Sequence, residues 1–309
     1  MNPNATFTLA HLSDPHLAYH HDIGLGDFLN KRLFGYLKWW LRRRSGHHGD
    51  VLTALIHDVR ASQPDHIVVT GDLTHLGLPA EFLKAKELLN MLGKPSQVTV
   101  IPGNHDAYVG SAWDRNLKHW ADYIVSDEID ITDDTLISSQ TLFPSLRVRS
   151  SIALIGVSTA RPSSTFLAVG SIGKRQLEGL QKILIDAGQR GLFRVVLIHH
   201  PPVSGVVSWR KRLTDAGAFR AIMQAHGVDL ILHGHAHRHS QGRVKTPGGQ
   251  APVIGISSAS AADNNSKRRA RYHLCRLSQT AGGWEVHVSV RSYLNQNKRF
   301  DVEAEYRLA

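Results

Sequence analysis

The sequence of 309 residues predicts a protein of the α/β class, in which buried strands lie between layers of helix. Two observations carry this prediction. Short runs of β-branched and aliphatic residues alternate with amphipathic segments along most of the chain, and each run leads directly into a loop rich in turn residues. In chain order, the predicted strands are Phe7–His11, His66–Thr70, Val98–Ile101, Ile152–Val157, Val195–His199, Leu230–His233 and Val253–Ser257.

Four segments between these strands repeat apolar residues at helical spacing, which predicts helices with one buried face. Val51–Ala61 follows Asp50, a residue type that caps helix N-termini, and Pro79–Leu92 begins with the proline that favours a first helical turn. Two more such segments are predicted to end before Gly188 and Gly227, because glycine commonly terminates helices.

The pattern changes in the C-terminal part of the chain. Valines alternate with polar residues in Trp284–Arg291, and Gly282-Gly283 separates this run from Tyr272–Ser278. We therefore expect residues 272–291 to form an antiparallel hairpin. No internal repeat interrupts the chain, so we expect residues 1–309 to form a single domain that includes this hairpin.

Composition excludes some classes of protein. Cys275 is the only cysteine, so a disulfide scaffold is excluded, and its place in a predicted strand indicates a core residue. No apolar run approaches the ~18 residues of a membrane-spanning helix, and Met1–Ala10 lacks the features of a secretion signal. We expect a cytoplasmic protein, either free or attached to a membrane surface. The net charge of +10 favours an anionic partner such as a phosphate, a lipid head group or nucleic acid.

Polar side chains that can bind metal follow five of the predicted strands. One such loop is usually a simple turn, but five of them in one chain indicate a shared site. Imidazole nitrogens mixed with carboxylate and amide oxygens suit manganese, iron, zinc, cobalt or nickel better than calcium. The donors exceed the needs of one ion, which predicts two ions about 3.5–4 Å apart that share one carboxylate. The candidate donors are Asp14, His16, Asp72, Asn104, His235, His237 and one of the adjacent pair His199 and His200.

These blocks read D-x-H, G-D, G-N-H-D, H and G-H-x-H in chain order, and they resemble the calcineurin-like metallophosphoesterase superfamily. The resemblance implies a two-sheet β-sandwich flanked by helices. It also implies that Asp72 bridges the two metals and that His105 protonates the leaving oxygen or stabilises the transferring phosphoryl group. The implied ligands are Asp14, His16, Asp72 and His237 for the first metal, and Asp72, Asn104, His199 and His235 for the second.

The expected chemistry is hydrolysis of a phosphoester or diphosphate by a hydroxide that the two divalent ions, preferably manganese, make available near neutral pH. One departure from the superfamily is informative. Its protein phosphatases extend the second block to G-D-x-x-D-R-G, whereas Gly71–Gly77 reads G-D-L-T-H-L-G. The missing aspartate and arginine count against a protein phosphatase, and they leave Asp106 and His75 as candidates for positioning His105.

Residues 25–44 form an insertion rich in aromatic and basic side chains. Plotted as a helix it has a wide apolar face beside a strip of charge. Such a helix either packs on the core or on a second copy, or lies in a membrane interface. The stretch Asn30–Tyr36 resembles the insertion of the UDP-diacylglucosamine pyrophosphatase branch, which cleaves a lipid-linked diphosphate in lipid A synthesis. The resemblance implies a nucleotide-lipid substrate and attachment to the inner face of the membrane.

Several functions stay open at this stage. The preferred substrate is a nucleotide-lipid diphosphate, and the alternative is a cyclic nucleotide or another small phosphodiester. Net charge alone favours a nuclease, and a scaffold without activity is disfavoured because no ligand position is missing. Guanidinium groups bind diphosphates in pairs of hydrogen bonds. The candidate substrate-binding residues are His200, Arg210, Arg212, Phe28 and Trp39.

Overall fold

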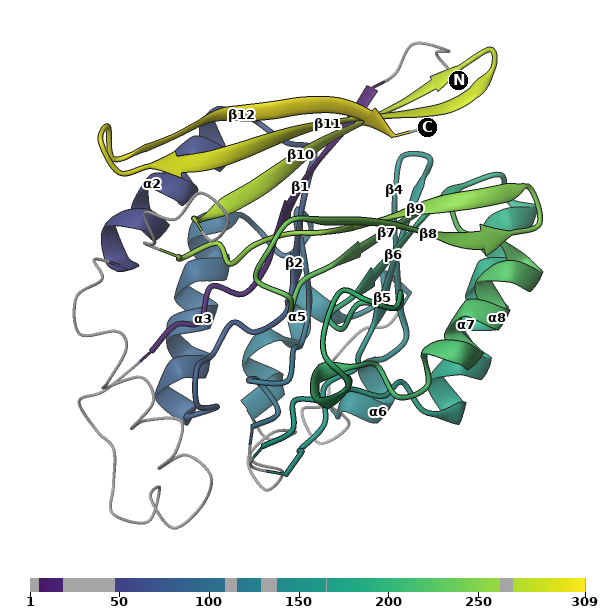
Figure 1. The fold of residues 1–309 in the computed structure, drawn as a ribbon, viewed down its shortest axis with the longest axis horizontal. Helices are drawn as coiled ribbons and strands as arrows, with labels where there is room; N and C mark the ends of the chain where they lie inside the picture. Colours follow the sequence, from purple (N-terminus) through teal and green to yellow (C-terminus); the bar gives the residue numbers. More distant parts are fainter. Residues whose placement is uncertain are drawn as a thin grey trace.

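The fold is a β-sandwich flanked by helices, as the sequence predicts (Figure 1). A computed structural model describes residues 6–18, 48–108, 116–128, 138–164, 166–261 and 269–308. Two six-stranded mixed sheets lie in the middle of the molecule. Helices α2 (His48–Ala61) and α3 (Pro79–Leu92) cover one side, and α7 (Lys174–Gln189) and α8 (Ala216–His226) cover the other.

The first sheet has the strand order β12-β11-β10-β1-β2-β3. β1 runs parallel to β2 and antiparallel to β10, and β2 runs parallel to β3. The predicted C-terminal hairpin is present as β10 and β11, and β12 extends it to three antiparallel strands. The strands are β1 (Thr6–Leu12), β2 (His66–Thr70), β3 (Val98–Ile101), β10 (Arg271–Thr280), β11 (Gly283–Leu294) and β12 (Arg299–Leu308).

The second sheet has the strand order β4-β5-β6-β7-β9-β8. Its four central strands run parallel, and the strand at each edge runs antiparallel to its neighbour. The strands are β4 (Ser145–Arg149), β5 (Ile152–Val157), β6 (Phe193–Ile198), β7 (Leu230–His233), β8 (Ser240–Thr246) and β9 (Gly249–Gly255).

Two helix boundaries differ from the predictions. α2 begins at His48, so Asp50 lies in its first turn and does not cap it. α7 continues past Gly188, whereas Gly227 does end α8 with a left-handed φ of 82°.

Short helical segments complete the described chain: η2 (Lys118–Trp120), α5 (Ala121–Ile124), α6 (Ser139–Leu142) and η4 (Trp209–Lys211). None of the helices described is long and apolar enough to cross a membrane.

Alternate side chains of the central strands pack on opposite faces. Leu154 and Val195 belong to the core between the two sheets, whereas Ile155 and Val196 pack in the cluster under α7 and α8. Because both faces are buried, these strands are apolar at nearly every position. Cys275 is a free, buried thiol of the core, and burial raises its pKa to about 12.

Candidate metal centre

The predicted metal ligands lie in loops that follow five strands, and hydrogen bonds join these loops. The amide of Asp14, after β1, donates to the carbonyl of Gly71, after β2, over 2.9 Å. Across the two sheets, His199 Nδ1 lies 2.7 Å from the carbonyl oxygen of Thr70. The amide of Gly234 donates to the carbonyl of His199 over 3.2 Å, which ties the loop after β7 to the loop after β6. Both sheets therefore contribute to one site.

The first cluster contains Asp14, His16, Asp72 and His237, whose candidate ligand atoms lie within 4.8 Å of one another. The Nε2 atoms of His16 and His237 are 3.0 Å apart, and His237 Nε2 is 3.2 Å from Asp14 Oδ1. His16 Nε2 is 3.8 Å from both Asp14 Oδ1 and Asp72 Oδ2. Two imidazoles and two carboxylates thus converge, which is a donor set suited to a transition-metal ion.

The second cluster contains Asp72, His199 and His235, and Asn104 joins it. His199 Nε2 is 3.3 Å from Asp72 Oδ2 and 3.2 Å from Asn104 Oδ1. Asp72 is 1% exposed and belongs to both clusters. The two clusters therefore meet at the carboxylate that was predicted to bridge two metals.

The backbone is strained at these positions. Among the described residues, eight non-glycine residues have a positive φ, and five of the eight are predicted ligands. A left-handed conformation of a non-glycine residue costs roughly 1–3 kcal/mol, and such residues cluster at functional sites. The five residues are Asp14 (54°), His16 (45°), Asp72 (54°), His235 (64°) and His237 (50°).

Glycines let the loops approach one another closely. A β-carbon at Gly103 would collide with the carboxylate of Asp72, and one at Gly234 would collide with Ser13 and Asp14. A β-carbon at Gly71, where φ is 96°, would lie 2.7 Å from His199 Nδ1. These three glycines are therefore required for the ligands to pack together.

The donors fit divalent ions. Asp14 Oδ1 is buried and has no hydrogen-bond partner among the described residues, although a hydrogen-bonded partner is the rule for a buried carboxylate oxygen. The same atom faces the two imidazoles of the first cluster. A cation between them would satisfy this oxygen, and the two clusters that share Asp72 fit a dinuclear divalent metal site.

Asp72 and His199 form a buried ion pair when no cation lies between them, and a bound cation would replace the proton of His199. Burial alone raises the pKa of a carboxyl, but the positive charge of His199 and neighbouring imidazoles holds the pKa of Asp72 well below its usual range. Burial alone lowers the pKa of His199, but the Asp72 carboxylate raises it to about 9. Burial holds the pKa of His235 well below its usual range, which favours the neutral form that binds metal.

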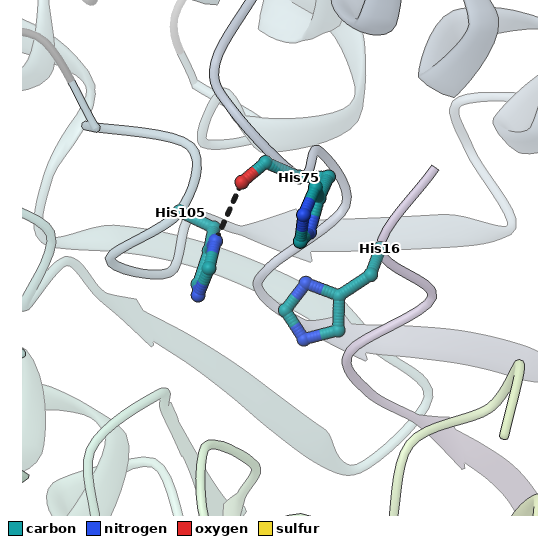
Figure 2. Close-up of side chains that lie close together, drawn as sticks. All are labelled: His16, His75 and His105. Atoms are coloured by element: carbon teal, nitrogen blue, oxygen red, sulfur yellow. Dashed lines mark hydrogen bonds between the residues drawn. The ribbon is translucent and has the colours of Figure 1, made fainter. Parts of the chain in front are cut away.

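Figure 2 shows how His105 is oriented. Its Nδ1 faces the main-chain carbonyl oxygen of His75 at 2.6 Å. Because a carbonyl only accepts hydrogen bonds, Nδ1 carries the hydrogen, and Nε2 is left for substrate. The rings of His75 and His105 lie nearly parallel, with centroids 5.6 Å apart, and His16 is edge-on to both. Of the two candidates for positioning His105, His75 therefore makes the contact, through its backbone.

Asp106 has another role, because it holds the loops together. It accepts hydrogen bonds from the amide of Gly103 at 2.8 Å and from the amide and hydroxyl of Thr74 at 2.8 and 2.9 Å. Burial and the nearby Asp72 carboxylate raise the pKa of Asp106 to about 7. It thus joins the loop after β2 to the loop after β3.

We expect Asp106→Ala to lower the free energy of unfolding by about 2–4 kcal/mol, because it leaves buried amides without acceptors. Urea denaturation in the presence of a chelator measures this without a contribution from bound metal. Asp127→Ala is the matched control, since Asp127 also accepts an amide hydrogen bond, from Val148, but at the surface. The control should lose less than about 1 kcal/mol, and equal losses would contradict the assignment to Asp106.

The predicted substrate-binding residues lie in different environments. His200 is buried, and its nitrogens lie 2.7 Å from Thr159 Oγ1 and 3.1 Å from the carbonyl oxygen of Ala168. Both ring nitrogens thus contact protein groups, so His200 packs beside the site and does not face substrate. Arg210 and Arg212 are exposed, with their guanidinium groups over the ring of Trp209. Phe28, Trp39 and the rest of the 25–44 insertion lie outside the described residues.

Glu81 is a further residue that shapes the site, and it belongs to none of the predicted motifs. This carboxylate is fully buried and accepts hydrogen bonds from the amides of His75, Leu76 and Leu78 at 2.8–3.2 Å. It therefore holds the loop whose carbonyl orients His105. A sequence signal for this role exists. Glu81 is the third residue of α3, the position at which a glutamate side chain can accept a hydrogen bond from the backbone that precedes the helix.

A two-sheet sandwich with two donor clusters that share one carboxylate defines a class of dinuclear metallohydrolases. Residues 7–239 match the model of the family described as calcineurin-like phosphoesterase, and the chain belongs to this family. A dimetal phosphatase from Danio rerio has the same fold, with a TM-score of 0.59, 15% identity and coverage of 96% of this chain and 98% of that one.

Two curated relatives are phosphodiesterases. A cAMP/cGMP dual specificity phosphodiesterase of Mycobacterium tuberculosis is 26% identical over 76% of this chain and 63% of its own length. A glycerophosphodiester phosphodiesterase of Enterobacter lignolyticus is 33% identical over 32% of this chain and 29% of its own length. The chain thus spans less than two thirds of each relative.

Proposed function

We propose that this chain hydrolyses small phosphodiesters with the help of two divalent metal ions. The observation that carries the proposal is the single buried carboxylate of Asp72 shared by two donor clusters. A shared carboxylate holds two ions close enough to act on one phosphate group. The relatives that cleave cyclic nucleotides and glycerophosphodiesters support the choice of a diester over other phosphate compounds.

The residues would divide the work as follows. Asp14, His16 and His237 would hold the first ion, Asn104, His199 and His235 the second, and Asp72 both. When bound, the ions supply positive charge that offsets the negative charge of the phosphate oxygens and lowers the pKa of water, so that hydroxide is available near neutral pH. Because the Nδ1 hydrogen of His105 is committed to the carbonyl of His75, only Nε2 can exchange a proton with the leaving oxygen. The expected ion is manganese, and iron, zinc, cobalt and nickel suit the same donors.

A second candidate is the diphosphate of a nucleotide lipid. It is favoured by the run of exposed cations Arg210, Lys211 and Arg212, which approaches the second cluster through the carbonyl of Lys211, 3.0 Å from His235 Nε2. A diphosphate presents more negative charge to such cations than a diester does. A cytoplasmic position at the inner face of the membrane belongs to this second proposal.

Substrate and metal dependence are tested together. We expect metal-loaded protein to hydrolyse bis(p-nitrophenyl) phosphate and at least one of cAMP, cGMP or a glycerophosphodiester. Removal of metal with a chelator should abolish turnover, and manganese should restore it, because the chain's own side chains provide no substitute for the ions. Release of product from each compound is the measurement.

Two outcomes would contradict the proposal. Full activity of the metal-free protein would exclude the role of the two clusters. Cleavage of an acylated nucleotide diphosphate at least about tenfold faster, in kcat/KM, than any diester would replace the diester by the second candidate.

A further inference from the structure

Two neighbouring loops beside the metal centre carry exposed aromatic side chains. Phe166 is 79% exposed and Trp209 is 63% exposed. Among the described residues these are the two most exposed large hydrophobic side chains, and the other four, on α3, α7 and β12, are not aromatic. Apolar side chains at this level of exposure, grouped on one surface, mark interaction sites.

The same loops are basic, and their one acidic residue, Asp215, accepts hydrogen bonds from the amides of Ile172 and Gly173. Segments 158–173 and 199–214 have no aspartate or glutamate, whereas Arg210, Lys211 and Arg212 follow Trp209 directly and are all exposed. Phe166, Trp209 and these three cations together form what we call the rim surface. Among the described residues none of these three cations forms an ion pair, so their charge is available to an anionic partner.

Backbone hydrogen bonds hold the two loops of the rim surface in place. The amide of Ala168 donates to the carbonyl of Arg210 over 2.9 Å, and the amide of Gly170 donates to the carbonyl of Arg212 over 3.1 Å. The amide of Thr214 in turn donates to the carbonyl of Gly170 over 2.9 Å. The exposed side chains therefore project from a fixed main chain.

The rim surface lies next to the metal centre. The carbonyl of Ala168 is 3.1 Å from Nε2 of His200, and the carbonyl of Lys211 is 3.0 Å from Nε2 of His235. One hydrogen bond thus separates each loop from a histidine of the site. A partner bound to the rim surface would be held beside the position of the substrate.

We infer that the rim surface docks on an anionic lipid bilayer. Tryptophan favours the head-group boundary, phenylalanine enters the acyl region, and lysine and arginine pair with anionic head groups. Single-stranded nucleic acid also combines aromatic and basic contacts, but it needs open ring faces for stacking. The ring of Trp209 already has the guanidinium groups of Arg210 and Arg212 over it at 5.5 and 5.8 Å. The surface is therefore better suited to insertion of the ring into an interface than to stacking with a base.

Vesicle co-sedimentation of the full chain tests this surface. Vesicles of phosphatidylcholine with about a third of phosphatidylglycerol are compared with vesicles of phosphatidylcholine alone. We expect wild type to prefer the anionic vesicles. The variant Phe166→Ser/Trp209→Ser should bind them at least about tenfold more weakly, because two apolar side chains no longer enter the bilayer. The variant Arg210→Gln/Lys211→Gln/Arg212→Gln should lose the preference for anionic lipid.

The matched control is Leu83→Ser/Met91→Ser, which removes two side chains of α3 that are 52% and 46% exposed. It should bind vesicles like wild type, and unchanged thermal unfolding and metal content show that each variant is folded. Wild-type protein that fails to bind anionic vesicles, or an aromatic variant that binds as well as wild type, overturns the inference. Binding to a single-stranded oligonucleotide but not to vesicles, lost in the rim variants, would assign the surface to nucleic acid instead.

Discussion

Replacing Asp72 by alanine is expected to empty both metal positions and to lower kcat/KM by at least about a thousandfold. The reason is that this one carboxylate belongs to both donor clusters, with Oδ2 3.3 Å from His199 Nε2 and 3.8 Å from His16 Nε2. Without it each cluster loses an anionic ligand, and the charge that balances two cations in a buried site is removed. Metal content by elemental analysis and turnover of a diester measure the two effects.

The control for Asp72 is Asp229, a half-buried aspartate outside the site. Asp229 pairs with Arg194 at 2.9 Å, at the opposite ends of the strands from the metal clusters. Asp229→Ala should keep both metals and nearly all turnover. If Asp72→Ala retained two metals per chain, the bridging role would be wrong, and loss of one metal alone would assign the carboxylate to a single cluster.

His105→Ala is expected to keep both metals and to lower kcat by about a hundredfold to ten-thousandfold, the range that general acid–base catalysis contributes. His105 is placed to exchange a proton through Nε2, and it belongs to neither ligand set that the family resemblance implies, although its ring also forms a third group of candidate donors with His16 and His75. In a plot of kcat against pH, the change in rate caused by titration of the His105 imidazole should be absent from the variant. Metal content measured on the same sample separates a catalytic loss from a loss of metal.

His75→Ala is the matched variant, because it removes a neighbouring imidazole but keeps the main-chain carbonyl that orients His105. Its kcat should fall by less than about tenfold. A loss as large as that of His105→Ala would show that the His75 ring, and not its backbone, does the positioning. A His105→Ala protein without metal would show that His105 acts as a ligand.

The fully buried strands could be predicted from the sequence, including β3 at a sheet edge, whereas the partly exposed edge strands could not. β2, β3, β5 and β7 begin and end at the predicted residues, because they are apolar runs bounded by turn residues. The three strands that escaped prediction, β4, β8 and β12, are all at a sheet edge. Edge strands face solvent and carry charge to avoid pairing with other molecules, and Arg299–Leu308 accordingly shows no apolar run.

Convergence of the metal-binding side chains could be anticipated, because polar residues after parallel strands meet at one edge of a sheet. The positioning of His105 could not, since a main-chain carbonyl has no signature in the sequence. Whether the partner is a carbonyl or a side chain depends on the path of the loop, and Glu81 sets that path from the first turn of α3. The left-handed backbone of His235 and His237 could not be predicted either, because a positive φ is uncommon for any residue other than glycine.

At the five left-handed residues, the residue type that suits the backbone differs from the residue type that binds metal. Glycine would relax the backbone at each of these positions, but it would remove the donor atom. A lineage released from selection for hydrolysis would therefore drift toward glycine or asparagine at Asp14, His16, Asp72, His235 and His237. Among descendants of one ancestor, the identity of these residues would record which branches still carry out the reaction and which have abandoned it.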